Sequence, residues 1–487
     1  MTPIRRRSTQ ALGALLLALA ACGGDGDGND TSPRGALGTL AYVETECRDT
    51  REGFVERQAL RIRQGDGVPV TVFETPGVGP LAGVAGLCRY LTRTRYGELA
   101  IARQAFQAVA VSPDGTSVVF EVSDEFSVSP PLPLNLPPDQ KGIFWVRADG
   151  TGLRRLGPPG RQRSFFLNSY GGVFTWPGLR FSPSGRTIAF ADRGPDAAGH
   201  DADQIGTIDV ATGTRMQITG LPPAHPPPPF LSDGPTIAIL PFIDERTVSF
   251  DSSANPGDLN PNGAFLLMTI ETDGSDLEVP LPSPIAVPGG VITLQFVITG
   301  DRPRATLVVV PGEPVNQSNP PTIREVFVID EKENALQLTN FRRSDTWEPL
   351  LDVDREQIYF PAAADPLGTN PSESCQIFSI DRTGGDLRQV TNFRESEHSL
   401  SGCLANGAVG QGCFVLLGAQ DPRNRPLVFY SSCDPLGTNP NGAQIFAVQP
   451  DGRGLRQLTD SPGLMREADG TFRATLPGQW AYGPYVP

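Results

Sequence analysis

Short runs of alternating apolar and polar residues cover most of the chain after residue 36, and Pro, Asp or Gly turns separate them. One order of runs recurs: a short apolar run, a turn, a run such as VVF or IAF, an alternating run, and a closing Leu/Val-Thr run. Alternation with period two over such short lengths predicts β-strands, four to a unit. No segment after residue 36 keeps a 3.6-residue apolar period between caps, so the pattern predicts an all-β protein.

The unit repeats along the chain. Residues 365–393 return almost verbatim as residues 434–460, and weaker copies lie upstream. The closing runs define seven units and lie near Val72, Leu156, Ile218, Val279, Leu338, Val390 and Leu458. Four-stranded units at a spacing of roughly 40–60 residues are typical of a β-propeller. We therefore predict a single propeller with seven antiparallel blades, while six or eight remain open because units one, four and five are degenerate.

The first unit lacks an obvious innermost strand. Its recognisable runs are TLAYVETEC, ALRIRQ and VTVFE, whereas the chain ends in a strand-like run at residues 471–487 that has no unit of its own. We expect this C-terminal run to complete blade one. Closure of that kind would remove the exposed sheet edges that otherwise promote aggregation.

The repeated pattern SPDG…F…DG…QLT resembles the WD40-like (PD40) repeat of the TolB-type propellers. It is clearest at Ser112–Gly115, Ser182–Gly185 and Gln444–Thr459, and the likeness covers most of residues 38–460. The resemblance implies a TolB-like propeller for residues 37–487. It is specific for the fold and implies little about activity.

The N-terminus has the features of a bacterial lipoprotein signal. Arg5, Arg6 and Arg7 precede an apolar stretch too short to span a bilayer, so residues 1–21 are predicted to be an export signal. The run Leu-Ala-Ala before Cys22 matches a lipobox, which makes Cys22 the predicted lipidation site. Residues 22–36, rich in Gly and Asp, would form a flexible tether. Since Gly23 stands where an inner-membrane retention Asp would be, we expect an outer-membrane location.

Six further cysteines, an even number, suggest three disulfides in an exported chain: Cys47, Cys88, Cys375, Cys403, Cys413 and Cys433. The strands of a blade are lettered A to D from the inside outward. Placed on this topology, all six cysteines fall on the face that carries the B–C loops. The pairs Cys47–Cys88, Cys375–Cys403 and Cys413–Cys433 fit this placement, and an alternative set joins Cys403–Cys413 and Cys375–Cys433.

Charge and motif content favour a binding protein over an enzyme. The formal net charge of −14 disfavours nucleic-acid partners, because an acidic surface repels phosphate. Only three histidines occur (His200, His225 and His398), and the chain contains no GxSxG or HExxH motif. We therefore predict no catalytic residues, no metal site and no cofactor. The alternative is a carbohydrate-active or other hydrolytic or lyase enzyme with its site at the mouth of the central channel.

One loop recurs between strands B and C. Residues 365–371 and 434–440 share the sequence DPLGTNP, and residues 255–261 keep its spacing. The candidate residues are Asn255, Asn260, Asp365, Asn370, Asp434 and Asn439. Their oxygens could bind calcium, but each block holds few carboxylates, so Asx turns that bond the loop's own backbone are the preferred interpretation.

The B–C face is the predicted binding face. Long loops are expected at residues 122–141, 192–204, 252–263, 311–323, 362–374 and 432–443. Long loops on a rigid scaffold usually carry function, whereas the turns at the opposite ends of the strands are short. The sequence thus predicts a monomeric envelope lipoprotein that binds an envelope protein or a glycan and contacts the membrane through its lipid alone.

Overall fold

The computed structural model describes residues 37–75, 78–81, 105–123, 136–160, 178–222, 237–258, 260, 266–279, 293–299, 302–309, 325–329, 335–342, 350–352, 357–393, 415–417, 426–438 and 443–483. Residues 35–487 form one compact unit. In its described part, the only helical segments are the single 3-10 turns η1 (Pro138–Gln140) and η2 (Pro256–Asp258). The residues predicted to be signal and tether, Cys22 among them, lie outside the described part.

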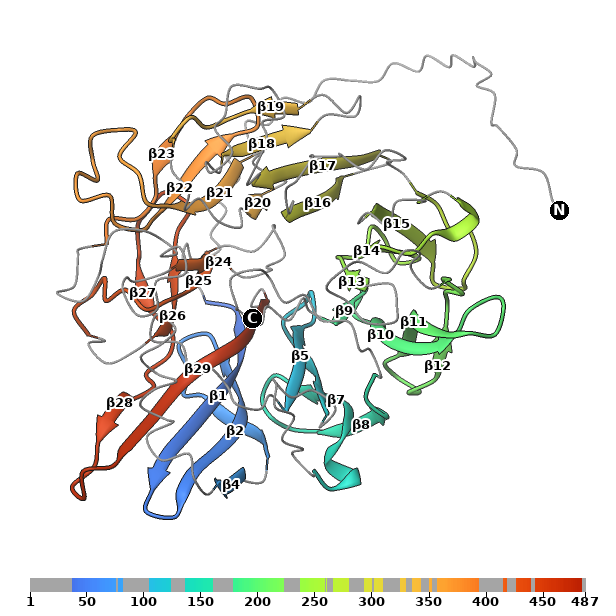
Figure 1. Cartoon of the computed structure of the whole chain (residues 1–487), viewed down its shortest axis with the longest axis horizontal. Helices are drawn as coiled ribbons and strands as arrows, with labels where there is room; N and C mark the ends of the chain where they lie inside the picture. Colours follow the sequence, from blue (N-terminus) through green and yellow to red (C-terminus); the bar gives the residue numbers. More distant parts are fainter. Residues whose placement is uncertain are drawn as a thin grey trace, which may run out of the picture. The chain divides into compact units, whose positions relative to one another are not determined.

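The described strands form seven antiparallel sheets, numbered in chain order, and Figure 1 shows the strands that compose them. The first contains β28 (Gly463–Arg466), β29 (Phe472–Gly483), β1 (Thr39–Thr50), β2 (Gly53–Gln64) and β3 (Val70–Glu74), and β4 (Val78–Leu81) also pairs with β2. The second contains β5 (Phe106–Val111), β6 (Ser117–Val122), β7 (Gly142–Arg147) and β8 (Arg154–Gly157).

The remaining sheets are built in the same manner. The third contains β9 (Leu179–Phe181), β10 (Thr187–Pro195), β11 (Asp201–Asp209) and β12 (Arg215–Gln217). The fourth contains β13 (Ile237–Ile239), β14 (Thr247–Ser252) and β15 (Leu266–Glu271). The fifth contains β16 (Thr293–Thr299), β17 (Arg302–Val309), β18 (Val326–Ile329) and β19 (Ala335–Gln337). The sixth contains β20 (Leu350–Asp352), β21 (Gln357–Ala362), β22 (Gln376–Asp381) and β23 (Arg388–Gln389); the seventh β24 (Val415–Leu417), β25 (Leu427–Ser431), β26 (Gln444–Val448) and β27 (Arg456–Gln457). In the described part, five of the seven sheets have four strands, the fourth has three and the first has six. The predicted all-β propeller built of four-stranded antiparallel units is thus confirmed.

The C-terminal strand joins the first sheet. β29 pairs with β1 from Thr39↔Gly483 to Arg48↔Arg473, with a bulge between Tyr42 and Glu44. Figure 1 shows the two ends of the repeat region, β1 in blue and β29 in red, side by side. The predicted partnership of the C-terminal run with unit one is therefore present, and β28 adds a strand that the sequence pattern did not indicate. The number of blades and full ring closure stay predictions.

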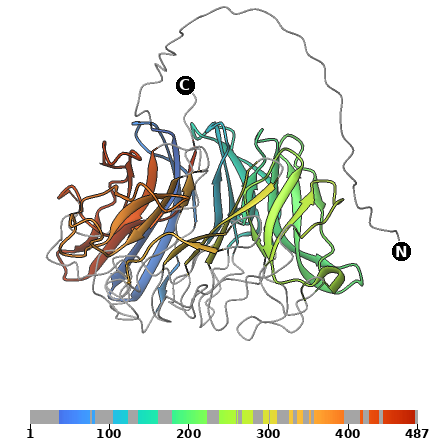
Figure 2. The same cartoon turned by 90° about the horizontal axis from the view of Figure 1, so that it is seen from above.

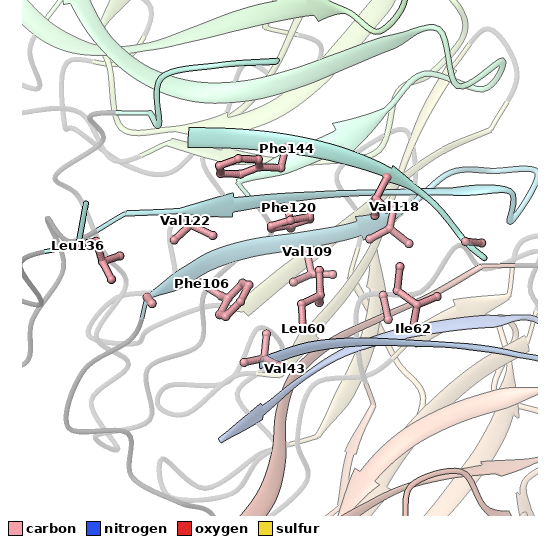
Figure 3. Close-up of a cluster of buried hydrophobic side chains, with 14 residues drawn as sticks. Val43, Leu60, Ile62, Phe106, Val109, Val118, Phe120, Val122, Leu136 and Phe144 are labelled. Atoms are coloured by element: carbon pink, nitrogen blue, oxygen red, sulfur yellow. The ribbon is translucent and has the colours of Figure 1, made fainter. Parts of the chain in front are cut away.

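Apolar clusters lie between neighbouring sheets rather than within one. Between the first and second sheets, Leu60, Phe120 and Phe144 belong to one buried cluster, which Figure 3 shows. Similar clusters join the second sheet to the third, the third to the fourth, the fifth to the sixth, and the sixth to the seventh. The seventh packs on the first through residues such as Tyr430 and Tyr482. Strands that are covered on both faces in this way have apolar residues on both, which explains runs such as SVVFEV.

A buried hydrogen-bonded unit, which we call the Gln–Thr clasp, holds the outer strands. Gln376 begins β22, and its Oε1 accepts hydrogen bonds from Thr391 Oγ1 (2.9 Å) and Phe393 N (2.8 Å). Its Nε2 donates to Phe393 O (3.0 Å), while Ile377 N donates to Thr391 Oγ1 (2.8 Å). The same set joins Gln204, Thr219 and Leu221 in the third sheet and Gln444, Thr459 and Ser461 in the seventh.

The strands run between two faces of this unit (Figure 2). One face, here the B–C face, carries the connections between second and third strands, such as residues 363–375. The other, the turn face, carries the tight turns at Gly115, Gly150 and Gly452, each with positive φ. The chain enters β1 on the turn face, because Gly38 O accepts from Gly65 N (3.0 Å) and Thr39 Oγ1 donates to Gly115 O (2.7 Å).

Candidate functional site

The B–C connections differ more than the sequence suggested. Residues 192–204 were expected to form a long loop, but this expectation is wrong: β10 continues to Pro195 and β11 begins at Asp201. Only residues 196–200 turn the chain, because Asp196 Oδ1 accepts from Ala198 N (2.8 Å) and His200 N (2.7 Å). A side chain that binds the turn's own backbone lets the flanking strands extend as a hairpin.

The loop of the sixth sheet is long, as predicted, and the side chains of Asp365 and Asn370 form hydrogen bonds within it. Asp365 Oδ1 accepts from Asn370 N (2.7 Å). The Asn370 side chain donates to Ala364 O (2.9 Å) and Ser374 O (2.8 Å), and its Oδ1 accepts from Ser374 Oγ (3.0 Å). Asn370 is buried, and these bonds use both of its amide protons. Its side chain therefore holds the loop and has no proton left for a ligand.

The other two candidate loops use the same chemistry. In the fourth sheet, Asn255 Oδ1 accepts from Asn260 N (2.6 Å), and Asn260 Nδ2 donates to Ala254 O (3.0 Å). In the seventh, Asp434 Oδ1 accepts from Thr438 N (2.9 Å). Asn439 lies outside the described residues. These contacts favour Asx turns over calcium binding, because the candidate oxygens already accept backbone protons.

Two outer-strand glutamines hold these loops, and the candidate residues chosen from the sequence did not include them. Thr369 Oγ1 donates to Gln389 Oε1 (2.6 Å), and Thr438 Oγ1 donates to Gln457 Oε1 (3.0 Å). Each glutamine also donates from Nε2 to the carbonyl of the clasp threonine, at 2.7 Å in both sheets. The recurrence of Gln two residues before Thr in the closing runs was the available signal. These bonds join the loop to the outer strand, so the loop lies over the outer part of the B–C face.

Each of the two identical loops exposes a leucine beside an exposed glycine and threonine. Pro366 and Leu367 face solvent in the sixth sheet, where Leu367 is 44% exposed. Leu436 occupies the equivalent position in the seventh sheet and is 43% exposed. Positive φ at Gly368 (69°) and Gly437 (67°) follows each leucine, a conformation that glycine adopts without strain. The repeated sequence therefore builds two alike, fixed projections on neighbouring sheets.

The described cysteines are buried at the ends of strands. Cys47 lies in β1, Cys375 directly precedes β22, and Cys433 follows β25, as predicted for the B–C face. Each of the three is disulfide-bonded. Cys88, Cys403 and Cys413 lie outside the described residues, so the three pairings stay predictions.

Titratable groups elsewhere show local structural roles. His200 is exposed, and its Nδ1 lies 3.2 Å from Asp196 Oδ2, while His225 and His398 lie outside the described residues. Burial raises the pKa of Asp251, within β14, to about 8, and in the described part its Oδ1 has no hydrogen-bond partner.

The described residues include no group of three or more His, Cys, Asp or Glu side chains placed to hold a metal ion. They also include no helix with the length and apolarity needed to cross a bilayer.

Of the comparisons with known proteins, only the one with solved structures finds matches. No protein-family model matches the chain, and a search of curated proteins finds no match. Among solved structures, a prolyl endopeptidase aligns at 11% identity and TM-score 0.45, over 88% of this chain and 53% of that one. The β-propeller domain of the Trilobed protease from Pyrococcus furiosus aligns at 11% identity and TM-score 0.44, over 88% and 95%. A putative TolB from Agrobacterium tumefaciens aligns at 12% identity and TM-score 0.30, over 90% and 99%.

The chain thus spans about half the length of the prolyl endopeptidase that it matches. At these identities and TM-scores, the solved structures carry no argument about this chain.

Proposed function

We propose that the protein is a non-catalytic cell-envelope lipoprotein that presents its propeller as a platform for binding an envelope protein or a glycan. One observation carries the proposal: the loops of the sixth and seventh sheets are fixed by internal hydrogen bonds and expose apolar side chains. A pre-ordered loop loses little conformational entropy when it binds, which favours recognition.

The anchor is the second part of the proposal. The lipobox before Cys22 motivates it, and an outer-membrane location follows from Gly23. We expect Cys22→Ala to move the protein from the membrane fraction to the soluble fraction, because a precursor without lipid lacks the attachment. Unchanged fractionation of that variant would contradict the anchor.

The platform is tested by removing its loops. Ala362 pairs with Gln376 and Ser431 pairs with Gln444, so a two-residue Asn-Gly turn can replace each intervening loop and close a hairpin. Because this removes Cys375 and Cys433, Cys403 and Cys413 are changed to Ser in the same variant. The matched control replaces residues 196–200 by the same turn. We expect affinity capture from the native envelope to lose its partner in the loop variant and to keep it in the control.

Capture of the same partner in equal amount by a folded loop variant would contradict the proposal. Folding of each variant is checked by its thermal unfolding transition. The alternative enzyme at the channel mouth stays a prediction of the sequence, and no contact among the described residues favours it.

A further inference from the structure

We propose that the turn face of the first and second sheets lies against the membrane surface, with Val68 entering the lipid headgroup layer. This inference rests on the lipid anchor of the proposed function and adds a second membrane contact to the lipid itself. It also orients the platform, because the B–C face would then point away from the membrane. The entry point of the chain, an apolar corner beside it and the charges around that corner support the inference.

The chain enters its first strand beside Val68. Gly38 directly precedes β1, and its carbonyl accepts a hydrogen bond from Gly65 N (3.0 Å) in the turn between β2 and β3. Val68 lies three residues further along that turn. The predicted tether is residues 22–36, and a flexible chain of that length has a mean end-to-end distance of about 20 Å. A lipid on Cys22 would therefore keep the turn face, rather than the B–C face, near the bilayer.

Apolar side chains project from this part of the turn face, and we call Val68, Val70 and Leu153 the apolar corner. Val68 is 87% exposed, the highest value among the exposed large apolar side chains in the described part of the chain. The two turns that carry the corner touch each other, because a β-carbon on Gly150 would lie 3.0 Å from Val70 Cγ1. Binding at a membrane surface strengthens with the apolar area that enters the headgroup boundary, so this corner suits shallow insertion.

The charges around the corner suit a bilayer better than the net charge of −14 suggests. Asp66 is paired with Arg63 (3.9 Å) and with Arg456 of the seventh sheet (3.4 Å). In the turn of the second sheet, the exposed Arg147 accompanies Asp149. The corner thus has three arginines around two aspartates, and arginine beside an apolar tip is attracted to anionic headgroups. Apolar exposure, local charge and chain entry therefore indicate the same occupant.

The experiment places the photo-crosslinking amino acid benzoylphenylalanine at position 68, 153, 367 or 336. The lipidated full chain is purified and bound to vesicles of phosphatidylethanolamine and phosphatidylglycerol. Leu367 on the B–C face (44% exposed) and Leu336 on an outer strand (49% exposed) are the matched controls for Leu153 (43% exposed). We expect phospholipid adducts from positions 68 and 153 and only background from 367 and 336. Mass spectrometry identifies each adduct as lipid or protein.

Two substitutions test the apolar and the charged part of the contact. Val68→Asp should lower the lipid adduct yield at position 153 about fivefold, because the transfer of one valine out of water is lost. Arg147→Glu should lower that yield in vesicles that contain phosphatidylglycerol and change it less than about twofold in vesicles of phosphatidylcholine. Arg51→Glu makes the same change in net charge between β1 and β2, on the B–C face, and should leave the yield unchanged. Thermal unfolding confirms that each variant is folded.

The contact and the anchor can fail separately. Equal lipid yields at all four positions would overturn the contact, and so would adducts at position 68 that join two copies of the chain and contain no lipid. A membrane-bound chain without lipid adducts at 68 would remove this contact, while release of Cys22→Ala would leave the anchor standing. Retention of Cys22→Ala on the membrane would remove the anchor and, with it, the basis of this inference.

Discussion

The B–C connections of the third and sixth sheets reverse the chain direction in different ways. In both, an aspartate side chain accepts backbone protons of the turn: Asp196 from residues 198 and 200, and Asp365 from residue 370. In the third sheet, β10 extends to Pro195 and β11 begins at Asp201, so the turn between them is short. In the sixth the strands stop at Ala362 and Gln376, and the loop lies back over the outer strand.

Below these connections the two sheets are alike. Gln204 and Gln376 make the same clasp with a threonine and with the second residue after it, at distances of 2.8–3.0 Å. In the fifth sheet Glu325 takes the place of the glutamine, and its Oε2 accepts from Thr339 Oγ1 (2.5 Å). There Arg342 N, at a φ of 56°, donates to the carboxylate (2.7 Å). The clasp therefore belongs to the scaffold, while the connection above it is free to differ.

The largest effect is expected when the clasp is removed. Gln376→Leu and Gln204→Leu should each lower the free energy of unfolding by about 2–4 kcal/mol, because buried threonine and backbone groups lose their partners. Chemical denaturation measures the change, and Gln389→Leu in the half-buried outer strand should cost less. Equal losses in the two sheets would support a shared scaffold role. If only Gln376→Leu lowered the free energy of unfolding, the effect would come from the loop of the sixth sheet and not from the clasp.

A smaller effect is expected from the loop asparagine. Asn370→Ala removes the donors to Ala364 O and Ser374 O and should destabilise the protein by about 1–3 kcal/mol. Asn260→Ala removes the equivalent bond to Ala254 O and should act in the same direction. Thermal unfolding is the measurement, with the exposed Asn392→Ala as control. If both variants unfold like the control, the two asparagines do not hold their loops.

The smallest effect concerns acid and the hairpin of the third sheet. Burial by itself raises the pKa of Asp196, but hydrogen bonds from His200 and Ala198 outweigh it and hold the pKa below its usual value. A carboxyl with a lowered folded pKa stabilises the fold above its unfolded pKa, which is about 3.9, and this contribution disappears as the pH falls through the folded pKa. Hydrogen-exchange protection of the 198 and 200 amides should therefore decrease below about pH 4.

The Asp196→Asn variant provides the control for this prediction. Because it has no carboxyl to protonate, its protection in the hairpin should show no comparable decrease over the same range. An acid-induced decrease of equal size in the variant would mean that another group opens the hairpin.

The sequence alone determined the scaffold. Period-two alternation, recurring turns and the near-verbatim repeat predicted the all-β propeller, because each short strand shows its two faces in its residue order. The orphan run at residues 471–487 predicted the pairing that β29 makes with β1. The Asx interpretation of the Asp365 loop also follows from local chemistry, since its donors and acceptors lie within a few residues of one another.

Only the tertiary structure decided which residues from distant segments of the chain pair or form hydrogen bonds with one another. Residues 192–204 have the composition of a polar loop, yet cross-strand pairing such as Asp192↔Gln204 makes most of them strand. The Gln376–Thr391 and Thr369–Gln389 contacts connect separate strands, so no local pattern reports their geometry. The exposure of Leu367 is likewise a property of the folded loop. Local periodicity fixes which face a residue takes within a strand, whereas exposure in a loop depends on which neighbours the fold brings to it.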